Sequence, residues 1–366
     1  MARVFWTAHK IVIGRIKSND LSALNGVCLP KILGCETREF KYICEENTPI
    51  MTNIPSVDLA DFLSGDAKRK VKFVAQIGQA YQEIGFVSLS NHFLTQELTQ
   101  ELYRQVKAFF DLPTEVKIRY EIPGLAGQRG YVSFGKEHAK GQSKGDLKEF
   151  FHFGQEPSLD ANLEAPYPDN VLVSECPDFN TTGMEAYRML EKTGIYVLRA
   201  LALYMDLEET YFDHWVNNGN SILRPIHYPP ITQEPEGAVR AGAHGDINLI
   251  TLLMGASAGG LQVLTKEGQW VDAKPKENQL VINVGDMLER HTNNKLRSTI
   301  HRVVNPPPDQ WDTPRYSIPF FMHPRSDMKL DCLDTCVSKN TPKAYPNITA
   351  GAFLDERLID IGLRKK

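Results

Sequence analysis

The chain has 366 residues, of which 42% are hydrophobic and 23% charged, so it is long enough to bury a substantial core. Its net charge of -4 and pI near 6.2 supply no basic field for a nucleic-acid backbone, which excludes nucleic acid as an expected partner. No hydrophobic run approaches the roughly twenty apolar residues of a membrane-spanning helix, so we expect no membrane partner either.

The first part of the chain differs in composition from the rest. The segment Met1 to Lys31 is basic, with Asp20 as its single acidic residue, and shows no clear apolar periodicity. Met51 begins a stretch that would itself serve as a natural start. We therefore predict that residues 1–50 are a disordered extension or the product of a start assigned too early.

Three later segments have apolar residues at helical spacing. We predict helices over Asp66 to Glu83, Leu94 to Phe110 and Thr181 to Leu207, and a strand over Gly85 to Leu89. The stretch from Gly124 to Gly145 is rich in glycine and charge, which predicts a mobile loop.

After about residue 220 the pattern changes to short strands separated by turns. The predicted strands are Ile247 to Met254, Gly260 to Leu264, Trp270 to Ala273, Leu280 to Val284 and Ser317 to Met322. This pattern indicates a mainly β fold with flanking α-helices: a double-stranded β-helix, or jelly roll, with helices packed on its outside. We expect an N-terminal α/β domain over 51–175, the jelly roll over 176–330 and a C-terminal tail over 331–366.

Two histidines and a carboxylate form a candidate metal site. His244 and Asp246 are two residues apart, so on a strand both side chains emerge on the same face, and His301 lies in a second strand-like run. Two imidazoles and one carboxylate occupy one face of an octahedral Fe(II) and leave the other open for substrate and O2. The alternative is structural histidines, because the chain has ten and an isolated HxD triplet is a weak signal. The surrounding motifs favour the metal, so we predict His244, Asp246 and His301 as the iron ligands and catalytic centre.

A second pair of residues has the same spacing. Arg315 and Ser317 are two residues apart on a predicted strand, so both would face inward. A guanidinium can bind the far carboxylate of an iron-chelating dicarboxylate in bidentate fashion, and a hydroxyl can add one hydrogen bond. The alternative is an arginine in a surface salt bridge; the nearby metal triad favours the ligand-binding role.

These motifs resemble the isopenicillin N synthase-like family of Fe(II)/2-oxoglutarate-dependent dioxygenases over about residues 53 to 325. The resemblance rests on the following segments: Ile54 to Leu59, Gly85-Phe86, Asn91-His92, Phe109 to Pro113, Arg129 to Tyr131, Asp146 to Glu149, Leu223-Arg224, Tyr228 to Pro230, the HxD triplet, Gly260 to Val263, Gly285-Asp286, His301 to Val303 and Arg315 to Ser317. It implies iron ligation by His244, Asp246 and His301, 2-oxoglutarate binding by Arg315, Ser317 and Tyr228, O2 as oxidant and ascorbate as a candidate reductant.

Three positions depart from the family pattern. Gly245 replaces the Thr or Glu common between the first two ligands, and we expect little consequence because that side chain would point away from the metal. Ile226 stands where many members have Asn, which removes one polar contact near the co-substrate. The link through residues 305–311 is longer than usual, and we interpret it as an extended hairpin loop.

The resemblance implies an enzyme, an oxidoreductase that uses 2-oxoglutarate to oxidise a small molecule with release of succinate and CO2. Asp246 leaves no ligand position vacant for a halide, so hydroxylation, desaturation or ring formation is favoured over halogenation. Two alternatives stay open. One is an Fe(II) oxidase of the isopenicillin N synthase type that needs no 2-oxoglutarate; the other, of a different class, is a non-catalytic jelly-roll binding protein.

The substrate side of the site is the least readable part of the sequence. We expect the loop from Gly124 to Gly145 and the C-terminal tail to contribute to it. An acidic substrate is slightly favoured, because several basic residues lie nearby: Arg129, Lys136, Lys140, Lys144 and Lys148. Phe151, His152 and Phe153 would line the cavity or, as the alternative, pack in the core.

The cysteines indicate the redox environment. Six cysteines without CxxC pairs are too sparse for a disulfide framework or a zinc site. We therefore expect a reducing compartment, the cytoplasm, and a monomer as the default state.

Overall fold

The computed structural model of the chain describes residues 54–137, 145–156, 167–235, 237–255, 257–273, 278–360 and 363. The prediction for residues 1–50 falls outside this part, as do Lys140 and Lys144. All described residues belong to one compact unit, Met51–Lys366. The finer division at residues 175 and 330 stays a prediction. None of the helices in these ranges is both long and apolar enough to cross a membrane.

The elements follow in chain order. The helices are α1 (Leu59–Leu63), α2 (Ala67–Glu83), α3 (Gln96–Phe110), α4 (Thr114–Lys117), α5 (Pro177–Tyr204), α6 (Asp213–Val216), α7 (Asp286–His291) and α8 (Ala350–Asp360), with 3-10 turns η3 (Ile118–Tyr120), η4 (Pro308–Gln310) and η5 (Asp334–Cys336). The strands are β1 (Ser56–Asp58), β2 (Phe86–Ser90), β3 (Gly130–Val132), β4 (Glu149–Gly154), β5 (Ile222–Leu223), β6 (Ile226–Tyr228), β7 (Ala241–His244), β8 (Ile250–Met254), β9 (Leu261–Leu264), β10 (Trp270–Asp272), β11 (Leu280–Val284), β12 (His301–Val303), β13 (Arg315–Ser317) and β14 (Pro319–Met322).

The strands form two sheets. The larger has the order β1-β2-β11-β8-β14-β5-β4-β6-β13, with β3 paired to β4, and the smaller has the order β10-β9-β12-β7. Among the described strands, β1 and β2 pair in parallel and all other pairs are antiparallel. This two-sheet arrangement with helices outside is the predicted jelly roll, so the predicted fold class is confirmed.

Side chains on the larger sheet alternate between two cores. On β11, Ile282 and Val284 join the apolar cluster shared with the helices, whereas Val281 joins a smaller cluster that includes Val263 and Val303 of the smaller sheet. Because successive side chains of a strand point to opposite faces, one face of the larger sheet packs on helices and the other faces the smaller sheet. The interior between the sheets is where the predicted ligands lie.

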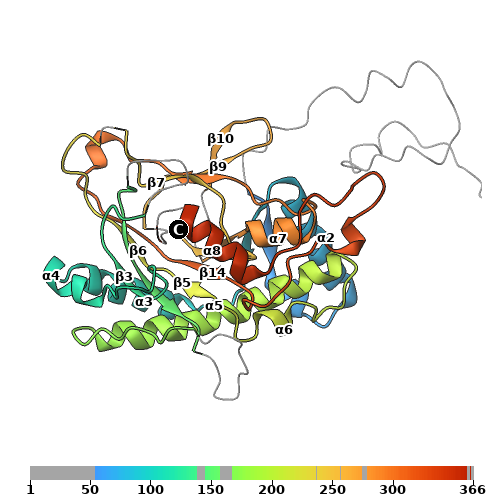
Figure 1. Ribbon diagram of the computed structural model, residues 1–366, viewed down its shortest axis with the longest axis horizontal. Helices are drawn as coiled ribbons and strands as arrows, with labels where there is room; N and C mark the ends of the chain where they lie inside the picture. Colours follow the sequence, from blue (N-terminus) through green and yellow to red (C-terminus); the bar gives the residue numbers. More distant parts are fainter. Residues whose placement is uncertain are drawn as a thin grey trace, which may run out of the picture. The chain divides into compact units, whose positions relative to one another are not determined.

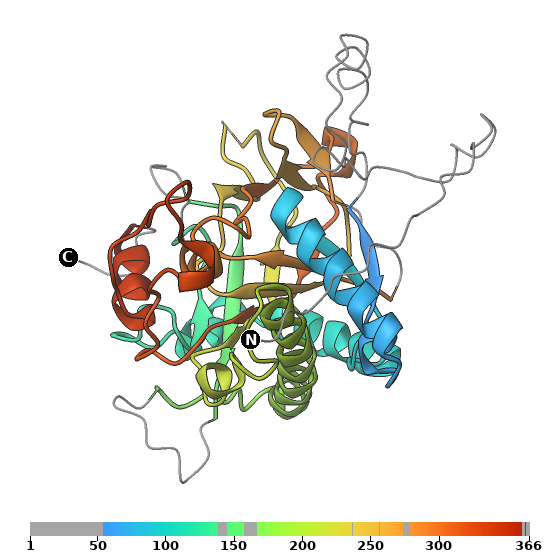
Figure 2. The ribbon, with the colours of Figure 1, turned by 90° about the vertical axis from the view of Figure 1, so that its right-hand side faces the viewer.

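The long helix α5 supports the outer face of the larger sheet, below which it runs in Figure 1. Tyr187 packs edge-on against Phe320 of β14, with ring centroids 5.0 Å apart. A Cβ at Gly194 would lie 2.4 Å from Sδ of Met322, so glycine permits this close approach. Figure 2, turned by 90°, shows α2 and α5 beside the strands, where both contribute to the larger core.

The predicted helices are confirmed, with adjusted bounds. Helix α2 begins after Asp66, whose side chain accepts hydrogen bonds from the backbone N–H groups of Lys68 and Arg69. Helix α5 begins four residues earlier than predicted, because Pro177 can occupy the first helical position, where no backbone donor is needed. The predicted loop after Gly124 contains the short strand β3, whose Tyr131 is buried.

Several strand predictions were wrong in detail. Strand β7 ends at His244 and β8 starts at Ile250, because Asp246 lies in a turn whose carbonyl accepts from the N–H of Asp286. The predicted strand Ser317 to Met322 is divided between β13 and β14. Residues 305–311 do not form a hairpin, since β12 pairs with β7 and β9 whereas β13 pairs with β6 of the other sheet.

Candidate metal centre and co-substrate site

His244 and His301 face each other across the β7–β12 pairing. Their ring centroids are 4.5 Å apart. Nδ1 of His244 donates to the carbonyl of Gly242 at 2.7 Å, and Nδ1 of His301 donates to the carbonyl of Thr299 at 3.1 Å. These bonds fix both ring orientations and leave Nε2 of each ring with a free lone pair, as a metal ligand requires.

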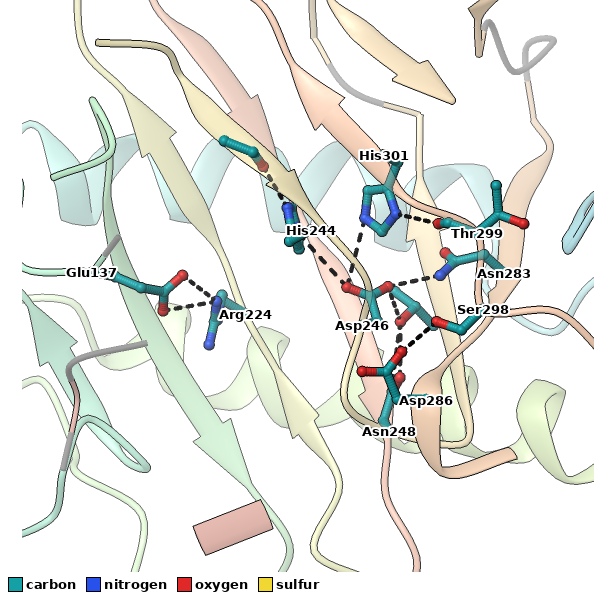
Figure 3. Close-up of polar contacts among 12 residues, drawn as sticks. Glu137, Arg224, His244, Asp246, Asn248, Asn283, Asp286, Ser298, Thr299 and His301 are labelled. Carbon is teal, nitrogen blue, oxygen red and sulfur yellow. Dashed lines mark hydrogen bonds and ion pairs between the residues drawn. The ribbon is translucent and has the colours of Figure 1, made fainter. Parts of the chain in front are cut away.

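Asp246 completes the triad from the turn after β7. Its Oδ1 lies 3.8 Å from Nε2 of His244 and 3.6 Å from Nε2 of His301. Its Oδ2 accepts hydrogen bonds from the Thr251 hydroxyl and the Asn283 amide. The two partners hold one carboxylate oxygen and leave the other facing the histidines. Figure 3 shows Asn283 on one side of the Asp246 carboxylate and His244 and His301 on the other.

The charges of the triad suit a divalent cation. Burial would raise the pKa of Asp246, but His301, His244 and the two hydrogen bonds lower it overall, so the group is a carboxylate at neutral pH. Enclosure in the cavity and the nearby His301 lower the pKa of His244 to about 4, so this ring is neutral. A neutral imidazole beside an ionised carboxylate is the protonation state that metal binding needs.

The geometry fits one metal ion. One ligand atom from each of His244, Asp246 and His301 lies within 4.8 Å of the others. Two imidazole nitrogens and one carboxylate oxygen on one side are the donor set of a facial non-haem Fe(II) site with open positions. The structure thus brings together the three residues predicted as ligands, although Asp246 reaches the site from a turn rather than from the strand.

The predicted co-substrate residues lie on the opposite sheet. Arg315 and Ser317 of β13 are both buried, and Tyr228 of β6 is the direct cross-strand partner of Arg315. Nε of Arg315 donates to the carbonyls of Ala258 and Gly259, while Nη1 is buried with no hydrogen-bond partner in the described chain. A buried guanidinium edge without a partner is costly unless a ligand supplies an acceptor. A carboxylate is the acceptor that matches it.

These two groups of residues border one cavity of about 370 Å³. The segments on either side of β3 contribute Gln128 and Glu137, and the C-terminal helix α8 contributes Leu354, Arg357 and Leu358. Both segments were expected on the substrate side. A cavity of this size is at the small end of ligand pockets, which indicates a small substrate beside the co-substrate.

Two cavity features were not predicted from the sequence. Arg224, after β5, donates from Nη1 to the Glu137 carboxylate, and both residues line the cavity (Figure 3). His323, after β14, is buried in the same cavity with Nδ1 unpartnered, and burial lowers its pKa to about 4. The Leu223-Arg224 motif was a signal for Arg224, whereas His323 follows a strand end and carried none.

The three described residues of the predicted basic group do not form a free cationic surface. Lys148 is buried and paired with Glu137 and Asp146 at 2.8 Å each, and the exposed Lys136 pairs with Glu121. Arg129 is buried against Gly154 and does not line the cavity. The expected attraction of these three residues for an acidic substrate therefore has no support in their placement.

The aromatic residues of β4 belong to the core, as the alternative predicted. Phe151 packs edge-on and Phe153 at a tilt against Phe179 of α5 in the larger apolar cluster. His152 points the other way and accepts a hydrogen bond from Nε of Arg224. Its effect on the cavity is therefore indirect.

Gly245 has a consequence that the sequence did not show. A Cβ at this position would lie 2.9 Å from Oδ1 of Asp286 and 3.1 Å from Oγ of Ser298. The Ser298 hydroxyl donates to the same Asp286 oxygen at 2.6 Å. A side chain at this position would point away from the ligands, as expected, but toward this buried hydrogen-bonded pair, so we predict a cost for a larger residue here.

Two family descriptions match the chain. Residues 54–175 match "non-haem dioxygenase in morphine synthesis N-terminal", and residues 219–324 match "2OG-Fe(II) oxygenase superfamily". The chain is 32% identical over 305 residues to the 2-oxoglutarate-Fe(II) type oxidoreductase hxnY of Emericella nidulans, a match that covers 81% of this chain and 86% of the relative.

Solved structures agree with this similarity. A 2OG-Fe(II) oxygenase family protein of Caulobacter crescentus superposes with a TM-score of 0.76 at 45% identity, covering 85% of this chain and 99% of that one. T7H of Neurospora crassa, solved with alpha-KG and thymine, gives a TM-score of 0.74 at 32% identity, covering 85% and 98%.

Proposed function

Because this chain belongs to the 2OG-Fe(II) oxygenase superfamily, we propose that His244, Asp246 and His301 hold its Fe(II) and that Arg315, Ser317 and Tyr228 bind its 2-oxoglutarate. The protein is an Fe(II)- and 2-oxoglutarate-dependent dioxygenase, an oxidoreductase that oxidises a small molecule with O2 and releases succinate and CO2. The non-catalytic alternative is thereby set aside.

One observation carries the ligand assignment. The free Nε2 atoms of His244 and His301 and the free Oδ1 of Asp246 converge, while the remaining atoms of each side chain are fixed by other groups. Bound Fe(II) would supply the activation of O2 and the oxidative decarboxylation of 2-oxoglutarate. The protein contributes a fixed facial ligand set and leaves the opposite side of the site open to the cavity.

Arg315 supports the co-substrate assignment. Its guanidinium is held by two backbone carbonyls through Nε, so the Nη1 edge is presented without rearrangement. The Ser317 side chain emerges on the same face two residues later and lines the same cavity. Tyr228, opposite Arg315, would limit the movement of the bound dicarboxylate.

The proposal also covers the branch of the family, the cellular compartment and the oligomeric state. The jelly roll preceded by the segment matched at residues 54–175 supports membership of the isopenicillin N synthase-like branch. The described cysteines, Cys176, Cys332 and Cys336, are free, which supports work in a reducing compartment such as the cytoplasm. All three proposed ligands come from one chain, so a monomer would be sufficient for activity.

The test is succinate release from purified protein supplied with Fe(II), ascorbate, O2 and 2-oxoglutarate. We expect release that requires iron and 2-oxoglutarate, and its loss in Asp246→Ala. Asp309→Asn, an exposed acidic residue in η4, is the control and should behave as the unchanged protein. Normal release in Asp246→Ala would overturn the metal assignment. Oxygen consumption without any need for 2-oxoglutarate would point instead to an oxidase of the isopenicillin N synthase type.

A further inference from the structure

We propose that the substrate is uncharged at the end that contacts Arg224 and presents a neutral hydrogen-bond acceptor, such as an amide or ketone carbonyl, to Nη2 of this residue. The inference rests on the function proposed above, and it names a substrate class for the same cavity. It depends on the position of Arg224, on the groups that hold it and on the balance of charge around it.

Arg224 is fixed on every side but one. Nε donates to Nε2 of His152, whose Nδ1 is occupied by the carbonyl of Gly127. Nη1 donates to Glu137, with contacts of 3.2 and 3.3 Å. The faces of the guanidinium are covered by aromatic rings, with the carbon Cζ 4.3 Å from the Phe150 centroid and 5.0 Å from the Phe321 centroid.

The remaining nitrogen is available to a ligand. Among the residues with described positions, the hydrogen bonds of the Arg224 guanidinium come from Nε and Nη1, and none comes from Nη2. Arg224 lines the cavity that also contains His244, Asp246 and His301. A donor held this rigidly loses little conformational entropy when a ligand binds, so it is suited to orient a substrate relative to the metal.

Among the described residues, the charged groups paired around Arg224 balance one another. Glu137 pairs with both Arg224 and Lys148, and Lys148 also pairs with Asp146. This gives two positive and two negative groups, all largely buried. Burial would raise the pKa of Glu137, but Arg224 and Lys148 lower it far below its usual range, so the carboxylate keeps its charge. Burial lowers the pKa of His152 well below its usual range, so this ring adds no charge.

This balance decides between an anionic and a neutral substrate group. A carboxylate at Nη2 would add an unbalanced buried negative charge close to Glu137, which is costly in a low-dielectric site. A neutral carbonyl would gain a charge-assisted hydrogen bond without that cost. The cavity therefore favours the uncharged acceptor, in contrast to the slight preference for an acidic substrate that the lysines suggested.

The test uses matched pairs of probes that differ in charge alone. Benzamide with benzoate, and cyclohexanecarboxamide with cyclohexanecarboxylate, are titrated into the protein loaded with Fe(II) and 2-oxoglutarate under anaerobic conditions, and binding is measured by ligand-observed NMR. We expect the amide of each pair to bind about tenfold more tightly than the acid, because only the acid brings an unbalanced negative charge into the site.

Two variants separate the role of Arg224 from that of Glu137. Arg224→Gln should weaken binding of the amides, because they lose the charged donor, and should leave the acids still disfavoured, because Glu137 then lacks a partner. Glu137→Gln should shift the preference toward the acid, because it leaves the charge of Arg224 uncompensated. Arg302→Gln, an arginine of β12 that stacks on Trp270 outside the cavity, should keep the preference of the unchanged protein. Circular dichroism and thermal melting of each variant confirm that it is folded.

The outcomes are distinct. Tighter binding of the acids by the unchanged protein, no binding of any probe, or an unaltered affinity for the amides in Arg224→Gln would each overturn the inference. Failure of the proposed function has a separate signature, which is the absence of iron-dependent succinate release. An enzyme that releases succinate but shows no charge preference would refute this inference alone.

Discussion

Thr251 and Asn283 lie directly opposite each other in the antiparallel pairing of β8 with β11, and both donate to Oδ2 of Asp246. The bonds measure 2.6 Å from the Thr251 hydroxyl and 2.7 Å from the Asn283 amide. The Thr251–Asn283 pair of the larger sheet thus orients Asp246, a proposed metal ligand that lies between the two sheets. The orientation of Asp246 depends on sheet register rather than on the turn alone.

The first prediction follows from this pair. Asn283→Ala should weaken Fe(II) binding by roughly 10- to 100-fold, because Asp246 loses one of the two bonds that fix its carboxylate. Thr251→Val should have an effect in the same range. Calorimetric titration with Fe(II) under anaerobic conditions measures the change. Asn217→Ala, at an exposed position after α6, is the control, and equal affinities in all three variants would contradict the role of the pair.

A second prediction concerns the co-substrate. Arg315→Gln should raise the Kd for 2-oxoglutarate by roughly 30-fold or more, because the loss of a buried charged partner leaves the carboxylate unpaired. Ser317→Ala removes one hydrogen bond and should cost about 2- to 10-fold. The Kd for 2-oxoglutarate is measured by titrating it into the iron-loaded protein. Arg302→Gln provides an arginine substitution outside the cavity, and an unchanged Kd in Arg315→Gln would reject the assignment.

Gly245 gives a third prediction, on stability. Gly245→Ala should destabilise the protein by about 1–3 kcal/mol, because the added methyl group would overlap the Asp286 carboxylate. Adding Ser298→Ala should recover part of the loss, since Asp286 could then turn away. Gly259→Ala is the control, because a Cβ there meets nothing within 4 Å. Chemical denaturation measures each change, and equal stabilities of the two glycine variants would contradict the clash.

The fourth prediction is a dependence of stability on pH. Burial raises the pKa of Glu191 in α5 to about 7. The folded protein therefore holds a proton that the unfolded chain, with an ordinary glutamate pKa near 4.5, has already released. Between the unfolded and the folded pKa of Glu191, the stability of the protein falls as pH rises. Above pH 7 the ionised, buried carboxylate destabilises the fold by its full amount.

Glu191→Gln removes this loss. We expect the variant to be more stable than the unchanged protein at pH 8 by roughly 1–3 kcal/mol and to lose most of that advantage by pH 4.5. Urea denaturation at the two pH values gives the difference. A constant stability difference across this range would show that Glu191 titrates normally in the folded protein.

Much of the fold and site was predictable because the signals are local. The helical spacing around α2 and α3 and the short strands after residue 220 follow from side-chain periodicity, which a single segment displays. The pairs His244 with Asp246 and Arg315 with Ser317 were found through spacing within one segment. The bounds of strands near the site were predicted less well, because the turn at Asp246 is set by its contact with the start of α7.

The sequence by itself determined the class of fold, the family and the residue types that can hold iron and a dicarboxylate, because these depend on periodicity and on motifs with fixed spacing. Tertiary structure alone decided which atoms are free to bind. The alignment of His244 with His301, the support of Asp246 by Thr251 and Asn283 and the charge balance at Arg224 all join segments distant in sequence. Sheet register and burial set these contacts, and neither can be inferred from the pattern of a short stretch of sequence.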